Sequence, residues 1–194
     1  MSNQPNAARA QIEQCITLMR NLAFLAQGSG GVAESDRRAI VLPQVIIESA
    51  MFFQEDGHGK NIQISLTDRV TQNKIQGHPE LIRQVLMNIF DNCIKYGTRD
   101  SIITVNQRIR AKSSTAVIEI SGVSQYPVRP EDLEKICDLG FRGSNAQKTL
   151  ASGTGLGLFI CKKIIEDHKG RLHIQANGSN GIIFTVTLPV GNVR

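Results

Sequence analysis

Residues 153–158 read Gly153-Thr154-Gly155-Leu156-Gly157-Leu158, and this GTGLGL string runs directly into the helical pattern of Leu158, Ile160, Cys161, Ile164 and Ile165. Glycines let the backbone come close to a ligand, and the first amides of a helix, at the positive end of its dipole, favour a polyphosphate. The string lacks the Lys-Ser/Thr of a P-loop, and no strand leads into it as a dinucleotide fingerprint requires. On its own it indicates either a phosphate-binding turn or an ordinary helix start.

A second stretch, residues 78–96, reads HPELIRQVLMNIFDNCIKY and predicts a long helix from Pro79 to Tyr96. Asn88, Asn92 and Lys95 are spaced by four and three residues, so they share one side of that helix. Amide oxygens can complete the shell of a Mg²⁺ that rests on nucleotide phosphates, and a Lys ammonium can offset phosphate charge. The alternative for the same residues is a solvated helix face with routine polar side chains.

The remaining elements follow from apolar periodicity. Helices are predicted at residues 43–55, 130–137 and 156–168, strands at 61–66 with a short partner at 74–76, a hairpin at 101–110 and 115–121, and closing strands at 171–175 and 182–188. This order predicts an α/β (α+β) two-layer sandwich, in which a mixed, mostly antiparallel sheet carries helices on one face.

The N-terminal part reads as one further helix, at residues 7–26, with an apolar stripe along one side. Gly28-Ser29-Gly30-Gly31 then disfavours helical order, so we expect two parts, residues 1–30 and 31–194. The stripe needs a partner surface. It suits either a homodimer formed through a helical bundle or packing back onto the chain's own domain.

Composition excludes several classes of function. The 194 residues carry a net charge of +5 with basic residues scattered singly, no Trp and only 5% aromatics, so nucleic-acid binding is not expected. The cysteines, at 15, 93, 137 and 161, fit neither a zinc site nor a disulfide framework, and we expect reduced thiols and a cytoplasmic location. The apolar runs are too short for a membrane span and the N-terminus has no signal-peptide core, so no membrane contact is expected.

Together the two stretches resemble the ATP-binding domain of sensor histidine kinases, in the GHKL superfamily with the Bergerat fold. Residues 78–97 resemble the N box of that family, and residues 129–143 resemble the segment before its ATP lid, with the F box at Phe141-Arg142. Residues 153–189 resemble the second glycine box and the terminal hairpin. The resemblance covers roughly residues 40 to 190.

The resemblance implies ATP and Mg²⁺ as cofactors and gives roles to individual residues. Asn92 is the implied Mg²⁺ ligand, Asn88 a supporting polar contact, and Lys95 and Tyr96 contact the nucleotide. The residues implied to line the phosphates are Gly153, Thr154, Gly155, Leu156, Gly157 and Leu158. The implied lid is Asp138 to Ser152, in which Arg142 or Lys148 is available to the γ-phosphate, and the catalytic set is Asn88, Lys95 and Arg142.

One position separates branches of the superfamily. ATPase-type and serine-kinase-type relatives carry a Glu one helical turn before the metal-binding Asn, where it can act as a general base. This chain has Asn88 there, which cannot take a proton. We therefore expect transfer to an imidazole, which is already a nucleophile when neutral, and disfavour an anti-sigma-type serine kinase.

The resemblance fails at the adenine anchor. Family members have Asp-x-Gly-x-Gly after the central hairpin, and the Asp accepts a hydrogen bond from the adenine amino group; here Gly122 stands in its place. A charge-assisted bond of this kind is worth about 1.5 to 3 kcal/mol, so its loss weakens ATP roughly tenfold to a hundredfold. Ser121, Ser124 or Gln125 would replace it only in part, and we expect weak or altered nucleotide binding.

Two functions remain. The leading one is the ATP-binding catalytic domain of a two-component sensor histidine kinase, which transfers the γ-phosphate to a histidine outside this chain, on a histidine-bearing dimerisation domain, in a pathway that ends on a response regulator. The chain's own histidines, at 58, 78, 168 and 173, each read as surface or capping residues, so no autophosphorylation by this chain alone is expected. The alternative is a degenerate kinase-like docking or phosphotransfer adaptor with weak or no ATP binding, which Gly122 favours.

Overall fold

The computed structural model describes residues 15–16, 18–19, 21–26, 32–53, 59–143 and 153–191. Backbone contacts divide the chain into two units, Met1–Gly30 and Gly31–Arg194. In the first unit every described residue is helical, as predicted for residues 7–26; the beginning of that helix and the glycine stretch 28–31 lie outside the described residues. The functional division into a dimerisation helix and an ATPase domain stays a prediction.

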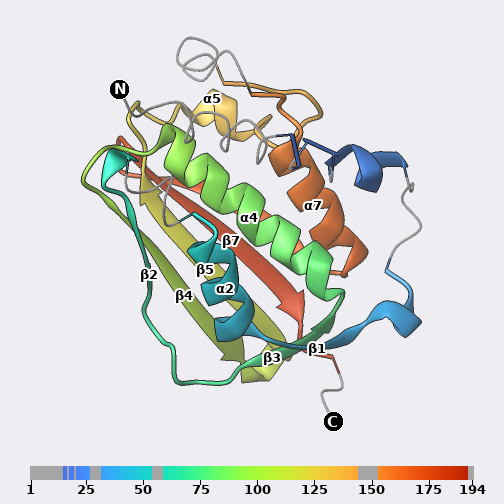
Figure 1. The fold of residues 1–194 in the computed structure, drawn as a ribbon. Helices are drawn as coiled ribbons and strands as arrows, with labels where there is room; N and C mark the ends of the chain where they lie inside the picture. Colours follow the sequence, from blue (N-terminus) through green and yellow to red (C-terminus); the bar gives the residue numbers. More distant parts are fainter. Residues whose placement is uncertain are drawn as a thin grey trace, which may run out of the picture. The chain divides into compact units, whose positions relative to one another are not determined.

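The second unit is a two-layer sandwich, in which helices α2 (Leu42–Met51), α4 (Pro79–Tyr96) and α7 (Gly157–Asp167) cover one face of a five-stranded sheet (Figure 1). The strand order is β2-β4-β5-β7-β6, with bounds β2 (Gln63–Leu66), β4 (Ile102–Arg110), β5 (Thr115–Val123), β7 (Gly181–Pro189) and β6 (Arg171–Asn177). β2 runs parallel to β4 and every other pairing in this sheet is antiparallel, so the predicted mixed, mostly antiparallel sheet is confirmed.

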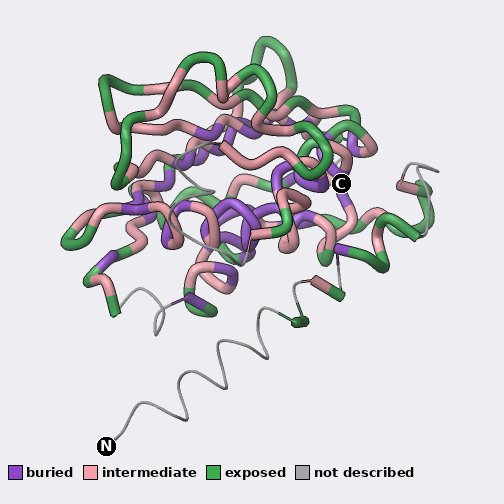
Figure 2. The backbone as a smooth tube through the Cα atoms, turned by 90° about the horizontal axis from the view of Figure 1, so that it is seen from above, coloured by how far each residue is buried: buried purple, intermediate pink, exposed green. Residues whose placement is uncertain are grey.

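The core lies between the two layers, where Figure 2 shows the buried segments gathered. The sheet contributes the alternating side chains of its central strands and the helices contribute one stripe each, among them Ile103, Val105, Ile118, Ile120, Phe184, Ile82, Leu86, Ile89, Phe90, Ile160 and Ile164. Burial of each such side chain stabilises the fold by about 1.5–3 kcal/mol. The apolar stripe of α4 therefore faces the sheet and turns Asn88 and Asn92 toward α7.

The chain also forms a separate two-stranded sheet, from β1 (Arg38–Val41) and β3 (Lys74–Gly77), which pair antiparallel. The prediction that residues 74–76 pair with residues 61–66 is therefore wrong. A buried Gln107 on β4 holds the intervening loop, since it accepts a bond from the Asn73 amide at 2.6 Å and donates one to the Thr71 carbonyl at 3.1 Å. These bonds hold the loop between β2 and β3 against β4, and β3 then pairs with β1 instead of β2. A period-two pattern shows which face of a strand is buried but not which strand is its partner.

Two predicted helices are shorter in the structure. α2 ends at Met51, and residues 54–58 lie outside the described residues. α5 spans only Pro130–Leu133, after which the chain continues in turns. So short an amphipathic segment cannot offset the entropy of helix nucleation beyond its first turn. η1 (Glu34–Asp36) and η2 (Ala111–Ser113) are single 3₁₀ turns.

The C-terminal end of α4 is fixed by a cation from outside the helix. The Lys60 ammonium donates to the carbonyl oxygens of Ile94 and Lys95, at 2.8 and 2.6 Å. These carbonyls are among the orphan acceptors at a helix end, where positive charge is favourable. Burial lowers the pKa of Lys60, with a smaller contribution from Arg99. The last turn of α4, which carries Lys95 and Tyr96, is thus held in place.

Candidate nucleotide site

The polar side of α4 meets the start of α7. Asn88 is only 3% exposed, and its side-chain amide nitrogen donates to the Gly157 carbonyl oxygen at 3.4 Å. The Asn92 amide nitrogen donates to the backbone carbonyl of Asn88 at 2.8 Å. That bond uses the nitrogen of Asn92, so its side-chain oxygen is the end that can ligate a cation. The structure therefore brings two of the three predicted helix residues to the glycine turn.

Gly157 leaves a space in front of these two asparagines. A Cβ added at Gly157 would lie 3.8 Å from both Asn88 Cγ and Asn92 Nδ2, which is ordinary contact distance. The glycine therefore keeps open a cradle that a side chain would fill. Gly157 is also the first residue of α7, whose amides and dipole favour an anion at this end.

Gly155 is required for a different reason. Its φ is +69°, and an added Cβ would lie 2.5 Å from the carbonyl carbon of Gly140. The two glycines are also joined by a hydrogen bond, from the Gly140 N–H to the Gly155 carbonyl at 3.2 Å. The turn is therefore clamped to the first residues of the predicted lid, and no pattern in the sequence indicates this role for Gly140.

The other turn residues have separate surroundings. The Leu156 N–H bonds to Thr154 Oγ1 at 3.4 Å, which closes the turn before α7. Leu158 is buried in the core. Arg142 lies against Gly153, since a Cβ at that glycine would be 3.1 Å from Arg142 Nε. Arg142 belongs to the described part of the predicted lid, residues 138–143, and Gly153 follows the lid; residues 144–152, with Lys148, lie outside the described residues.

Lys95 is held by a neighbour that the sequence analysis did not single out. Its ammonium lies 2.6 Å from Asp91 Oδ2, one helical turn earlier. Burial raises the pKa of Asp91, and the Lys95 charge and hydrogen bond oppose that rise. The spacing of four residues between Asp91 and Lys95 is the signal that predicts such a pair. The structure does not bring Lys95 to the glycine turn by any described contact.

Tyr96 links the end of α4 to the segment after β5, because its carbonyl accepts the Gln125 N–H at 2.8 Å.

Of the three candidate substitutes for the adenine anchor, Ser121 bonds through its hydroxyl to the Thr104 carbonyl of the neighbouring strand at 3.4 Å. The Ser124 hydroxyl accepts the Tyr126 N–H at 3.3 Å. Ser121 thus uses its hydroxyl proton on the backbone, and Ser124 uses one of its two acceptor lone pairs there.

Gly122 lies on β5 opposite Ile182, and its missing side chain would point at α4. An added Cβ would lie 3.8 Å from Cys93 Sγ and 3.9 Å from Ile103 Cγ1, both at ordinary contact distance. Burial raises the pKa of the Cys93 thiol to about 12, so it stays neutral and gives the spot no negative charge. The structure thus has room for a side chain at position 122 beside the residue that follows Asn92.

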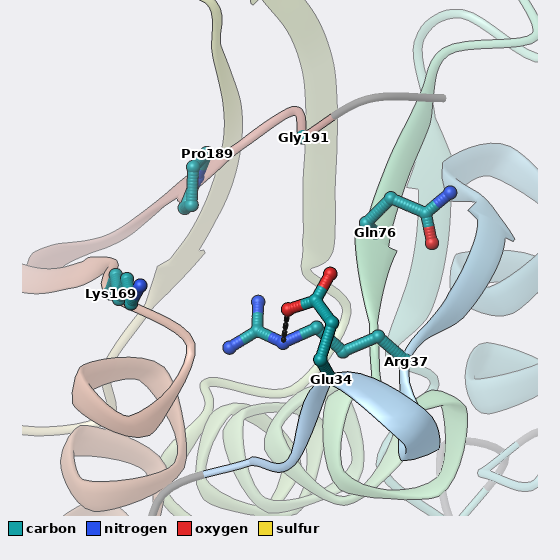
Figure 3. Close-up of a pocket in the computed structure, with 6 residues that line it drawn as sticks. All are labelled: Glu34, Arg37, Gln76, Lys169, Pro189 and Gly191. Carbon is teal, nitrogen blue, oxygen red and sulfur yellow. Dashed lines mark ion pairs between the residues drawn. The ribbon is translucent and has the colours of Figure 1, made fainter. Parts of the chain in front are cut away.

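A separate hollow of about 400 Å³ lies at the other end of α7 (Figure 3). It is lined by Glu34, Arg37, Gln76, Lys169, Pro189 and Gly191. Lys169 follows the C-terminus of α7, whereas Gly157 begins the helix. The predicted site residues are not among those that line it.

Two asparagines of one helix lie against a glycine turn at the start of another helix. This arrangement, on a two-layer fold, is typical of the class of ATP-binding domains that the sequence resembles. The family model for the histidine kinase-, DNA gyrase B- and HSP90-like ATPases matches residues 77–192. The chain belongs to this family, and its relatives place it among the catalytic ATP-binding domains of sensor histidine kinases.

Two curated relatives illustrate the similarity. The sensor histidine kinase ZraS of Salmonella typhi is 31% identical over 153 residues, which cover 79% of this chain and 31% of that protein. The sensor protein KdpD of Clostridium acetobutylicum is 27% identical over 184 residues, or 95% of this chain and 20% of that protein. The chain therefore spans less than a third of the length of either relative.

Solved structures agree. The nucleotide-free catalytic domain of histidine kinase ThkA is 26% identical with a TM-score of 0.66, over 79% of this chain and 97% of that one. Full-length ShkA, at 16% identity and a TM-score of 0.72 over 97% of this chain and 39% of that one, shares the fold. Within the part of the chain that the structure describes, every helix is too short or too polar to cross a membrane.

The contrast between Gly155 and Gly157 gives a first test. Gly155→Ala should lower the free energy of unfolding by more than about 2 kcal/mol, because it combines a positive φ with a clash against Gly140. Gly157→Ala, the matched control, should change it by less than about 1 kcal/mol, because its Cβ meets only ordinary contacts. Urea denaturation measures both. Equal effects from the two variants would contradict the clamp between Gly155 and Gly140.

Proposed function

We propose that the chain binds Mg-ATP between the polar side of α4 and the glycine turn before α7, and presents the γ-phosphate to a histidine outside the chain. The observation that carries this proposal is the junction of Asn88 and Asn92 with Gly157. The bonds that the two asparagines make use their amide nitrogens, so the side-chain oxygen of Asn92 remains to ligate a cation.

The residues present fit a magnesium nucleotide. Asn92 offers a neutral amide oxygen, and Mg²⁺ takes oxygen ligands while keeping several waters and resting on substrate phosphates. The described residues hold no cluster of three or more His, Cys, Asp or Glu side chains that would bind a metal without a nucleotide. When bound, Mg²⁺ screens the charge on the phosphate that ATP supplies.

The chain's own residues would bind and position rather than exchange protons. Asn88 cannot act as a base, which suits an imidazole acceptor because neutral imidazole needs no deprotonation to attack. Arg142, which lies within the predicted lid and beside Gly153, would place a guanidinium near the γ-phosphate. Lys95, paired with Asp91, would contact the nucleotide together with Tyr96, and residues 153–158 would line the phosphates.

The acceptor histidine would come from a histidine-bearing dimerisation domain, and a response regulator would receive the phosphoryl group in turn. Support comes from the relatives, which are sensor kinases about three to five times the length of the matched segment. In the first helix Ile16, Met19 and Leu22 are exposed apolar side chains. We propose that they pair with a second copy of the chain.

A docking or phosphotransfer adaptor that does not use ATP is the second candidate, and Gly122 is the observation that favours it. Without a carboxylate there, the adenine amino group loses its charged acceptor, while the fold that a partner would recognise is unchanged.

The Mg²⁺ role of Asn92 can be tested by calorimetry. Asn92→Ala should weaken Mg-ATP binding at least about tenfold, because it removes the only proposed protein ligand of the metal. Asn106→Ala, an exposed asparagine on β4, is the matched control and should leave the affinity unchanged. Equal Mg-ATP affinities for both variants would remove Asn92 from the site.

The adenine anchor can be restored. Gly122→Asp should tighten Mg-ATP roughly tenfold to a hundredfold, because the structure has room for the side chain and a carboxylate accepts a charge-assisted bond. Gly122→Ala fills part of the same space without an acceptor and should not tighten binding. A wild-type dissociation constant of about 1 μM or lower would contradict the expectation of weak binding.

Autophosphorylation provides a separate test. His168 is buried with both ring nitrogens bonded, His173 lies exposed on β6, and we expect none of the chain's histidines to be an acceptor. Incubation of the chain alone with radiolabelled ATP should give no acid-labile label. Addition of a histidine-bearing hairpin from a related kinase should give label on the hairpin. Label on the chain itself would refute transfer to an outside histidine.

A further inference from the structure

His168 joins the two helices of the nucleotide site at their far end. It follows Asp167, the last residue of α7, and is 1% exposed. Its Nε2 accepts the backbone N–H of His78 at 3.0 Å, and its Nδ1 lies 2.7 Å from the Ile164 carbonyl oxygen. An accepting Nε2 requires the ring proton on Nδ1, which then donates to Ile164. One neutral tautomer therefore satisfies both contacts.

The same ring serves two helix ends. His78 is the residue before α4, and its N–H is among those that a helix start leaves without an intrahelical partner. Ile164 contributes one of the last carbonyls of α7, which already accepts the backbone N–H of His168 at 3.1 Å and takes a second bond from the ring. The ring also packs closely on the end of β3, where a Cβ at Gly77 would lie 3.1 Å from His168 Cδ2. His168 thus fixes the C-terminus of α7 against the N-terminus of α4.

A series of contacts between the antiparallel helices α4 and α7 runs from His168 to the nucleotide site. From the site outward, Gly157 bonds to Asn88 at 3.4 Å, and the Cys161 thiol lies 3.6 Å from the Val85 carbonyl. The His168–His78 bond closes the other end, about 16 Å from Gly157 at the helical rise of 1.5 Å per residue. A slip of one residue along this pair would move Gly157 by about 1.5 Å relative to Asn88 and Asn92.

We propose that His168 is a positioning residue for the nucleotide site: its neutral ring sets the axial position of α7 on α4 and so holds Gly157 against Asn88 and Asn92. Protonation ends this hold, because an imidazolium presents an N–H to the His78 N–H in place of an acceptor. The inference rests on the proposed Mg-ATP site.

The surroundings keep the ring neutral. Burial is the main cause that lowers the pKa of His168, and the Ile164 carbonyl opposes it. Arg37, before β1, and His78, before α4, lower this pKa further, while Asp167 of its own helix raises it. Figure 3 shows the Arg37 side chain extending toward the end of α7, where its guanidinium lies 3.5 Å from the Asp167 carbonyl.

Acidification should remove the contribution of His168 to the stability of the fold. The pKa of a histidine in the unfolded chain is about 6.5, and the folded value is lower, so the unfolded state binds more protons below about pH 6.5. The contribution of His168 to stability is therefore complete above that pH. It is lost as the pH falls from about 6.5 toward the folded pKa.

Two variants separate the effect of losing the hydrogen-bond acceptor at position 168 from the effect of protonating it. The Oε1 of His168→Gln stands four bonds from Cα, like Nε2 of histidine, so it can accept the His78 N–H and does not titrate. His168→Asn reaches only the Nδ1 position and loses the bond between the helices. His173→Gln, at an exposed histidine on β6, is the matched control.

Calorimetry of Mg-ATP binding to the full chain, at about pH 7.5 and about pH 5, is the first measurement. At the higher pH, His168→Asn should bind about tenfold more weakly than the wild type and His168→Gln within about threefold of it. At the lower pH, the wild type and His173→Gln should each lose about fivefold in affinity relative to His168→Gln. His168→Gln serves as the reference because titration of ATP itself affects all of the proteins equally. An identical pH profile for wild type and His168→Gln would overturn the proposal.

Amide hydrogen exchange without nucleotide separates this inference from the proposed function. At one fixed pH, His168→Asn should speed exchange in residues 153–158, far from the substitution, and His168→Gln should not. Unchanged exchange there in His168→Asn would overturn the positioning role. If Mg-ATP fails to bind any of the proteins, the proposed function fails, and the exchange result alone decides whether His168 controls the glycine turn.

Discussion

The position of the glycine turn depends on one polar contact between α4 and α7, the bond from the Asn88 amide to the Gly157 carbonyl. This bond joins the middle of α4 to the first residue of α7. It forms only where Gly157 comes within hydrogen-bond distance of the buried Asn88 side chain. A buried amide without that acceptor would cost about 1–3 kcal/mol. The contact therefore ties the position of the glycine turn to the helix that carries Asn92, and the open space in front of Asn92 exists because Gly157 has no side chain.

Much of the fold could be predicted from the sequence because its long elements carry strong periodicity. The bounds of α4 were predicted correctly, and both long hairpins follow from alternating patterns joined by short turns. The parallel pairing of β2 with β4 and the pairing of β1 with β3 could not be predicted. The loop between β2 and β3 is bonded to Gln107 of β4, a contact between residues more than thirty positions apart. Local patterns carry no information about such a contact.

The candidate site was predictable in part for the same reason. Asn88 and Asn92 could be placed on one helix side by counting, and the helix start after GTGLGL followed from its apolar pattern. The clamp between Gly140 and Gly155, and the bond between His168 and His78, join segments that only the tertiary fold brings together. The ion pair of Asp91 with Lys95 is different, since its spacing of four residues is visible in the sequence and typical of a pair on one helix face.

The central claim is that Mg-ATP occupies the space between Asn92 and the glycine turn. It is tested most directly by nuclear magnetic resonance of the isotopically labelled chain during titration with Mg-ATP. The side-chain amide signals of Asn88 and Asn92 and the backbone signals of Gly155 and Gly157 should shift together, with one common dissociation constant. Signals from β1, β3 and the hollow at Arg37 should stay in place. Shifts confined to that hollow, or none at any of these residues, would contradict it.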